Sequence, residues 1–112
     1  MIRIKRIYDL PAPEDGRRVL VDRLWPRGVA KEAAHIDDWL KEVAPSDELR
    51  KWFGHDPARW EEFRRRYRQE LQGHNELLES LRKEARLGNV TLLFAAKDME
   101  HNNAVILKEV LS

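Results

Sequence analysis

The chain has 112 residues, and its 21 lysines and arginines against 20 aspartates and glutamates leave a formal net charge of +1. This length favours one domain over residues 1–112, and 42% hydrophobic residues can fill one core, which argues against disorder. A mean hydropathy of −0.70 excludes a membrane span of about 20 apolar residues, and the lack of cysteine excludes disulfides, thiolate metal sites and cysteine nucleophiles. We therefore expect a cytoplasmic protein without a membrane segment.

Two strands are predicted near the start of the chain. Residues 2–7 alternate isoleucine with basic side chains, which is typical of a half-buried strand, and residues 18–24 form a second, more apolar strand. The segment DLPAPEDG between them is rich in turn residues, and its shortness predicts an antiparallel hairpin. That hairpin would send Tyr8 and Asp9 to the edge of the sheet opposite the end of the second strand.

Residues 31–87 are expected to be helical. Asp56 followed by Pro57 is the strongest start signal for a helix, and the apolar residues after it recur on one helix face. Gly73 is expected to end this helix in the left-handed conformation. The residues predicted for the buried face are Trp60, Phe63, Tyr67 and Leu71.

The last strand and helix define the fold class. Residues 90–96 are uninterruptedly apolar, as a central parallel strand should be, and a helix is expected from about residue 100 to residue 111. The long helical link between the second and last strands favours a parallel pair joined by a right-handed crossover. We therefore predict an α/β fold: a small single domain with a short, mostly parallel sheet covered by helices.

Parallel strands bring two polar loops together, residues 22–28 and residues 97–103, at the edge where open α/β sheets bind ligands. The second loop leads into a helix whose N-terminus attracts anions, and the basic side chains would add positive charge. Carboxylates and an imidazole in the same loops could act as acid or base. The predicted catalytic residues are Asp22, Asp98 and His101. The predicted ligand-binding residues are Arg23, Trp25, Arg27, Lys97, Asn102 and Asn103.

Two functions stay open. The first is binding of a small anionic ligand, a nucleotide or a phosphorylated or carboxylated metabolite, with or without hydrolytic or transfer chemistry. The second is a non-catalytic regulatory or interaction module that binds protein or nucleic acid, in which Asp98 and the two asparagines only cap a helix and the arginines only form ion pairs. Whether the protein is an enzyme is left undecided by the sequence.

Metals, cofactors and nucleic acids receive little support. The four histidines lack the HxH or HxxxH spacing of metal ligands, and no phosphate-binding or dinucleotide-binding glycine motif predicts a cofactor. The basic run at residues 64–68 is a candidate for nucleic-acid binding. However, Glu61 and Glu62 precede it on the same helix and can pair with Arg65 and Arg66, so we expect a solvated helix face.

Three blocks of sequence are specific in combination: LVDRLWPRG at residues 20–28, WFGHDPARWEEFRRRYRQEL at 52–71 and VTLLFAAKDMEHNNAVIL at 90–107. With them the chain resembles the YeaO-like branch of domain of unknown function 488, a family of small bacterial and archaeal proteins. The resemblance covers essentially the whole chain and implies a single α/β domain but no established reaction. Relatives in the broader family carry a cysteine at the end of the last strand and Cys-His-Arg in the next turn. The matching positions here are Phe94 and Asn102-Asn103-Ala104, which argues against transferring that chemistry.

Overall fold

The computed structural model describes all residues 1–112 and contains a four-stranded sheet, all of whose neighbouring strands are parallel, in the order β1-β4-β2-β3. The predicted α/β fold is thus confirmed. In chain order the elements are β1 (Ile2–Arg6), β2 (Arg17–Leu20), α1 (Lys31–Ala34), β3 (Asp38–Trp39), α2 (Asp47–Phe53), α3 (Trp60–Leu71), α4 (Asn75–Leu87), β4 (Val90–Phe94) and α5 (Asn103–Leu111).

Strand directions confirm one prediction and overturn another. β2 and β4 are parallel neighbours, as the helical crossover predicted, with Val19 opposite Leu92. β1, however, pairs in parallel with β4 and not antiparallel with β2, so the predicted hairpin is wrong. The link between β1 and β2 includes a 3-10 turn at Pro13–Asp15 and returns the chain to the opposite end of the sheet before β2 begins. Tyr8 and Asp9 therefore follow β1 at the same edge as the end of β2.

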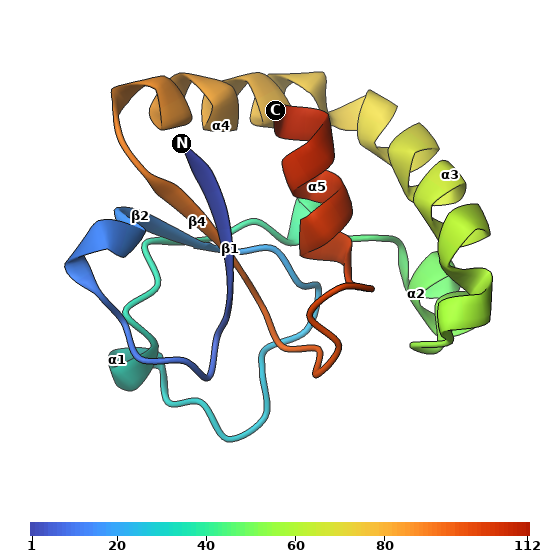
Figure 1. Cartoon of the computed structure of the whole chain (residues 1–112), viewed down its shortest axis with the longest axis horizontal. Coiled ribbons are helices and arrows are strands. Elements are labelled where there is room, and N and C mark those ends of the chain that lie inside the picture. Colours follow the sequence, from blue (N-terminus) through green and yellow to red (C-terminus); the bar gives the residue numbers. More distant parts are fainter.

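Helices cover one face of the sheet, and a smaller layer covers the other (Figure 1). β4 is buried along its whole length because it lies between two strands and under both layers. On the helical face, Val19, Leu92 and Phe94 belong to the main core with α2, α3, α4 and α5. On the other face, Leu20 and Leu93 pack in a small cluster with α1 and the chain that leads to and from it.

The helix signals in the sequence are confirmed in part. All four residues of the predicted apolar stripe of α3 are buried. Asp56 Oδ1 accepts a hydrogen bond from Ala58 N–H (3.0 Å), which starts a 3-10 turn that runs into α3. Gly73 does not adopt the predicted left-handed conformation, because a 3-10 turn leads directly into α4. None of the helices has the length and apolar character that crossing a membrane requires.

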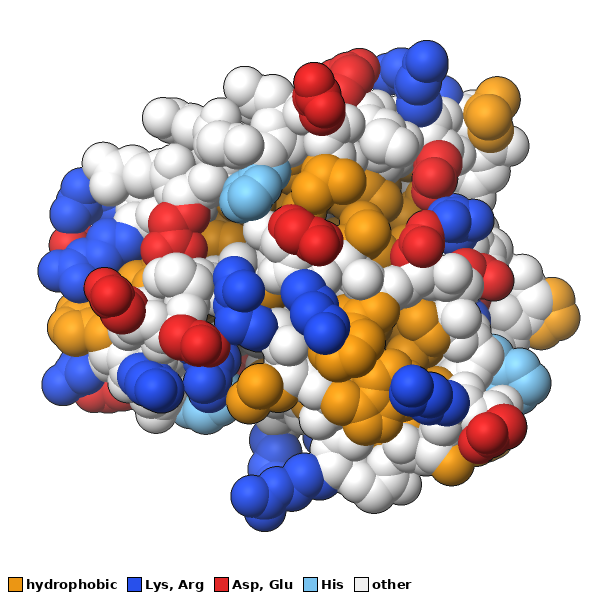
Figure 2. Space-filling model, turned by 180° about the vertical axis from the view of Figure 1, so that it is seen from behind, with side chains coloured by type: hydrophobic (Ala, Val, Ile, Leu, Met, Phe, Trp, Pro, Cys, Tyr) orange, Lys and Arg blue, Asp and Glu red, His pale blue; other side chains and the backbone are white.

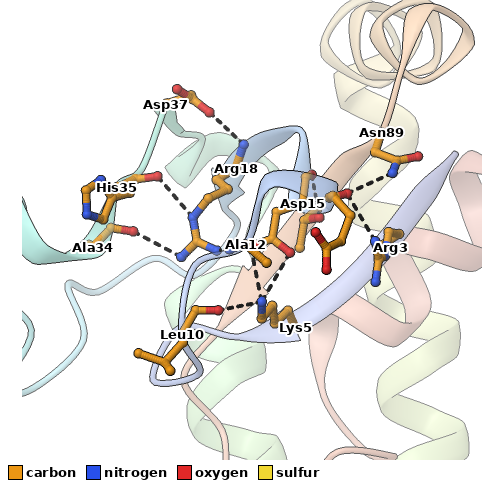
Figure 3. Close-up of polar contacts among 12 residues, drawn as sticks. Arg3, Lys5, Leu10, Ala12, Asp15, Arg18, Ala34, His35, Asp37 and Asn89 are labelled. Carbon is orange, nitrogen blue, oxygen red and sulfur yellow. Dashed lines mark hydrogen bonds and ion pairs between the residues drawn. The ribbon is translucent and has the colours of Figure 1, made fainter.

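A buried ionic cluster fixes the second layer to the sheet (Figure 3). The side chain of Asp15, which is only 1% exposed, accepts hydrogen bonds from Lys5 Nζ (3.1 Å), Arg18 Nη1 (2.5 Å) and Ala12 N–H (3.0 Å). The buried Arg18 guanidinium also donates to the backbone oxygens at the end of α1, Ala34 O and His35 O. Every charge in this cluster has a partner, so it holds β1, β2 and α1 in register.

Candidate functional site

The carboxyl ends of β1, β2 and β4 lie at one edge of the sheet, and their loops form the candidate site. Residues 22–28 follow β2, residues 95–102 connect β4 to α5, and Tyr8 follows β1. In Figure 2, basic side chains project from the lower end of the molecule, toward which these strands run in Figure 1. The two loops that were predicted to meet are therefore neighbours. Tyr8 also lies at this edge, whereas the predicted hairpin placed it at the opposite edge of the sheet.

Asp22 and Asn103 join the two loops directly. The Ala95 N–H, just after β4, donates to Asp22 Oδ2 (2.9 Å), and Asn103 Nδ2 at the start of α5 donates to Val21 O (2.9 Å). The Asp22 backbone oxygen also accepts a hydrogen bond from Trp39 Nε1 (2.7 Å). These bonds hold the ends of β2 and β4 at a fixed separation.

Burial sets the electrostatics of Asp22. Loss of water around its carboxyl raises its pKa, while the Ala95 N–H, the Asn103 amide and the charge of His55 each favour the carboxylate. Burial raises the pKa of Tyr67, and the charge of the Asp22 carboxylate adds to this rise; the Tyr67 hydroxyl donates to Val43 O (2.5 Å). His55 and Tyr67 were not predicted as site residues, because no motif marks them and only tertiary packing brings them near Asp22.

Asp98 and His101 form a compact pair within the second loop. Asp98 Oδ1 accepts hydrogen bonds from the N–H groups of Glu100 (2.9 Å) and His101 (3.0 Å), and Oδ2 lies 2.9 Å from His101 Nδ1. The Glu100 N–H, with the His101 side chain and N–H, holds the pKa of Asp98 below its ordinary value. The His101 ring stands edge-on against Trp60, with ring centres 5.2 Å apart, which leaves Nε2 as its free nitrogen.

Three further predicted residues have structural partners. Asn102 is the N-cap of α5, since its side-chain oxygen accepts a hydrogen bond from Val105 N–H (3.1 Å). Arg23 turns toward the chain before α2, where its guanidinium donates to Pro45 O (3.0 Å). Trp25 donates to Val29 O (2.7 Å) and packs edge-on against Trp39. The helix expected from about residue 100 begins only at Asn103.

Arg27 and Lys97 are the exposed cations of the two loops, and neither side chain has a carboxylate or hydrogen-bond partner. Their backbones are held from β1. Tyr8 Oη donates to Arg27 O (3.1 Å), and Arg6 donates to the carbonyl oxygens of Ala95 (3.3 Å) and Ala96 (2.9 Å), directly before Lys97. Arg6 and Tyr8 were missed as contributors because the predicted hairpin pointed β1 the other way.

The arginine run on α3 is paired with carboxylates. Glu62 binds both Arg65 (2.6 Å) and Arg66 (2.8 Å), so the predicted pairing of Arg66 is confirmed and that of Arg65 with Glu61 is wrong. Glu109 on α5 binds the other two arginines of the run, Arg64 and Arg68. These pairs neutralise part of the charge of the run, which is typical of a solvated helix face.

The chemistry available at the edge is limited by its nucleophiles. Asp98 and His101 have the geometry of a base with an orienting carboxylate, a pair that can activate a side-chain hydroxyl or thiol or a water molecule. The Ser46 hydroxyl is bound to Glu70 (2.6 Å), and the Thr91 hydroxyl is bound to Asp15 O (2.7 Å) in the other layer. The arrangement can bind charge and donate hydrogen bonds, and it offers no activated side-chain nucleophile.

Comparisons with known proteins agree over the whole chain. An uncharacterized protein of Escherichia coli (strain K12), YeaO, is 42% identical over 110 residues, which are 98% of this chain and 96% of that protein. An uncharacterized protein of Mycobacterium tuberculosis (strain ATCC 25618 / H37Rv) is 41% identical over 111 residues, 99% of this chain and 93% of that protein. No solved structure matches the chain.

A family model described as "Inactive DUF488-N3 subclade" matches residues 1–112. The resemblance noted from the three sequence blocks is thus confirmed, and the chain belongs to the DUF488 family, in the branch described as the inactive DUF488-N3 subclade.

Proposed function

We propose that the protein is a cytoplasmic binding protein for a small anionic ligand, a nucleotide or a phosphorylated or carboxylated metabolite, at the carboxyl edge of its sheet. The observation that carries the proposal is that Arg27 and Lys97, on the loops after neighbouring strands, are both exposed and that neither forms an ion pair with a carboxylate. Lack of cysteine fits a reducing compartment.

Preorganisation supports the anion site. Two exposed cations on mobile loops would lose much conformational freedom on binding, which weakens affinity. Here Tyr8 and Arg6 anchor the backbone at Arg27 and just before Lys97, so less of that cost remains. The N-terminus of α5 lies in the same loop region and adds the positive end of a helix dipole.

We propose binding without chemical conversion. The description of the family branch as inactive supports this choice, as does the engagement of the Ser46 and Thr91 hydroxyls elsewhere. Asp98 and His101 then serve to fix the loop before α5, and Asp22 serves to join that loop to β2.

A thermal-shift titration tests the proposal with inorganic pyrophosphate, ADP and citrate as probes and glucose as a neutral comparison. A ligand present at about 100 times its dissociation constant stabilises the folded protein by about 2.7 kcal/mol. We expect at least one anion to raise the melting temperature and the double variant Arg27→Ala/Lys97→Ala to lose that rise.

The matched control removes two exposed lysines elsewhere, Lys51→Ala/Lys83→Ala on α2 and α4, and should keep the full shift. An anion-induced shift that survives in the Arg27→Ala/Lys97→Ala variant would refute the site. Equal loss in both double variants would show only a general charge effect and would also count against it.

A further inference from the structure

The sheet has one open edge, and it is β1. Val90 N–H donates to Met1 O (2.9 Å) and Ile7 N–H donates to Phe94 O (2.8 Å), so the odd-numbered residues of β1 hydrogen-bond with β4. The backbone groups of the even-numbered residues point away from the sheet. Of these, only the Arg6 carbonyl is used, by Asp9 N–H (3.1 Å). The N–H and C=O groups of Ile2 and Ile4 and the N–H of Arg6 are available to another strand.

The opposite edge of the sheet is closed by contrast. β3 has only two residues, and the neighbouring outer backbone of β2 is taken up by the connecting chain. Asp37 Oδ2 accepts a hydrogen bond from Arg18 N–H (2.8 Å), and Asp37 N–H donates to Arg18 O (2.8 Å). A short strand and a side chain bonded to the ladder are standard protections of an edge. β1 has five residues and lies at the front of the sheet in Figure 1, where no other segment crosses it.

Positive charge follows the open edge. Arg3 and Arg6 are half-buried beside it and donate hydrogen bonds only to backbone oxygens, so no carboxylate neutralises either one. Lys5 shares the single carboxylate of Asp15 with Arg18, which leaves that group of three with a net charge of +1. The complementary partner is therefore an extended segment that carries acidic side chains.

The same charges exclude a second copy of the chain as the occupant. In an antiparallel pair of β1 strands, the outward-facing even residues must oppose even residues. The odd residues on the other face then oppose each other. Registers that place Ile2 opposite Ile4, Ile4 opposite Ile4, or Ile4 opposite Arg6 place Arg3 opposite Arg3, Arg3 opposite Lys5, or Lys5 opposite Lys5, respectively. Like charges directly opposite each other destabilise a strand pair, so the basic side chains disfavour self-association at this edge.

We propose that the open edge of β1 binds an extended acidic segment of a partner protein, which adds to the sheet as a fifth strand. Backbone hydrogen bonds to Ile2 and Ile4 supply the pairing, and Arg3 supplies the charge selection. This surface is separate from the carboxyl-edge loops, so it can act whether or not the anion site is occupied.

The probe is a fluorescein-labelled seven-residue peptide of alternating valine and glutamate, measured by fluorescence anisotropy against the full-length protein. We expect saturable binding that weakens as salt is raised, and binding at least tenfold weaker to Arg3→Glu. Arg3 bonds only to the exposed Glu14 O, so this variant should keep the wild-type urea midpoint. The control Lys83→Glu, on an exposed position of α4, should bind within twofold of wild type.

Two altered peptides separate strand addition from simple charge attraction. The valine–lysine peptide should not bind, because its charge matches that of β1. The valine–glutamate peptide with every amide N-methylated keeps its charge but cannot pair with a strand edge, and it should also fail to bind. Binding of the N-methylated peptide, equal binding to Arg3→Glu, absence of binding to the wild-type protein, or a β1-mediated dimer in sedimentation velocity would each overturn the proposal.

Discussion

The buried ionic cluster makes a quantitative prediction for Asp15→Asn. Asparagine has nearly the same shape as aspartate but removes the one carboxylate that Lys5 and Arg18 share. The Lys5 side chain is 22% exposed and can turn to water, whereas Arg18 is 4% exposed and would remain as a buried, unpaired cation. Breaking a buried ion pair from one side costs about 3–5 kcal/mol. Because Arg18 keeps its bonds to two backbone oxygens, we expect about 3 kcal/mol.

Urea unfolding followed by circular dichroism measures this loss. With a slope of about 1.5 kcal/mol per molar urea, the midpoint should fall by about 2 M. Burial alone would raise the pKa of Asp15, but the bonds from Ala12, Lys5 and Arg18 hold it below the ordinary 3.8. The stability that Asp15 contributes is therefore complete above pH 3.8 and is lost as the pH falls through the lower folded pKa.

The difference between wild type and Asp15→Asn should consequently shrink as the pH falls below 3.8. Asp9→Asn, at an exposed aspartate whose side chain has no partner, is the control and should stay within about 0.5 kcal/mol of wild type. A loss below about 1 kcal/mol for Asp15→Asn at pH 7 would refute the assignment of Asp15 as the anchor of this cluster.

Three further substitutions test other parts of the fold by the same urea assay. Gly16→Ala should destabilise by at least about 3 kcal/mol, because a Cβ at φ +62° would lie 2.1 Å from Asn89 O; a smaller loss would contradict this close approach. Tyr67→Phe should cost about 1–3 kcal/mol, since Val43 O loses its hydrogen bond inside the core; an unchanged midpoint would count against that bond. Asp22→Asn should be at least as stable as wild type at pH 7, because burial raises the pKa of Asp22 and penalises its carboxylate. The free energy of unfolding of wild type should rise relative to that of this variant as the pH falls through the raised folded pKa toward 3.8. A stability difference that stays constant across that pH range would refute burial as the cause of the raised pKa.

The parts of the fold that the sequence predicted correctly are those governed by local periodicity. β4 is a continuous apolar run and is buried throughout, and α3 repeats its aromatic residues at the spacing of one helix face. The direction of β1 was missed because a ten-residue link suits a hairpin in length, and nothing local reveals that β4 inserts between β1 and β2. β3 was missed because a two-residue strand has no periodicity to detect.

The candidate site was likewise predicted in part, and the residues that only tertiary packing brings together were missed. Parallel pairing of β2 and β4 was sufficient to bring Asp22 and Asn103 to one place, and the structure joins their loops through hydrogen bonds. His55 could not be found, because its approach to Asp22 depends on how α2 packs against the sheet. The backbone partner of Arg23 was equally hidden, since its carbonyl acceptor belongs to a segment 22 residues away.

The two proposed binding surfaces share Arg6 but otherwise depend on different residues, so they can be separated experimentally. The anion site depends on Arg27 and Lys97, and the strand-addition edge depends on Arg3. Arg6 contributes to both regions, since it supports the loop after β4 through two carbonyls and lies beside the open edge of β1. Arg3→Glu should therefore abolish peptide binding without changing any anion-induced thermal shift, and Arg27→Ala/Lys97→Ala should do the reverse. Arg6→Ala should weaken both, because it removes a positive charge beside the open edge of β1 and the two hydrogen bonds to the loop that follows β4.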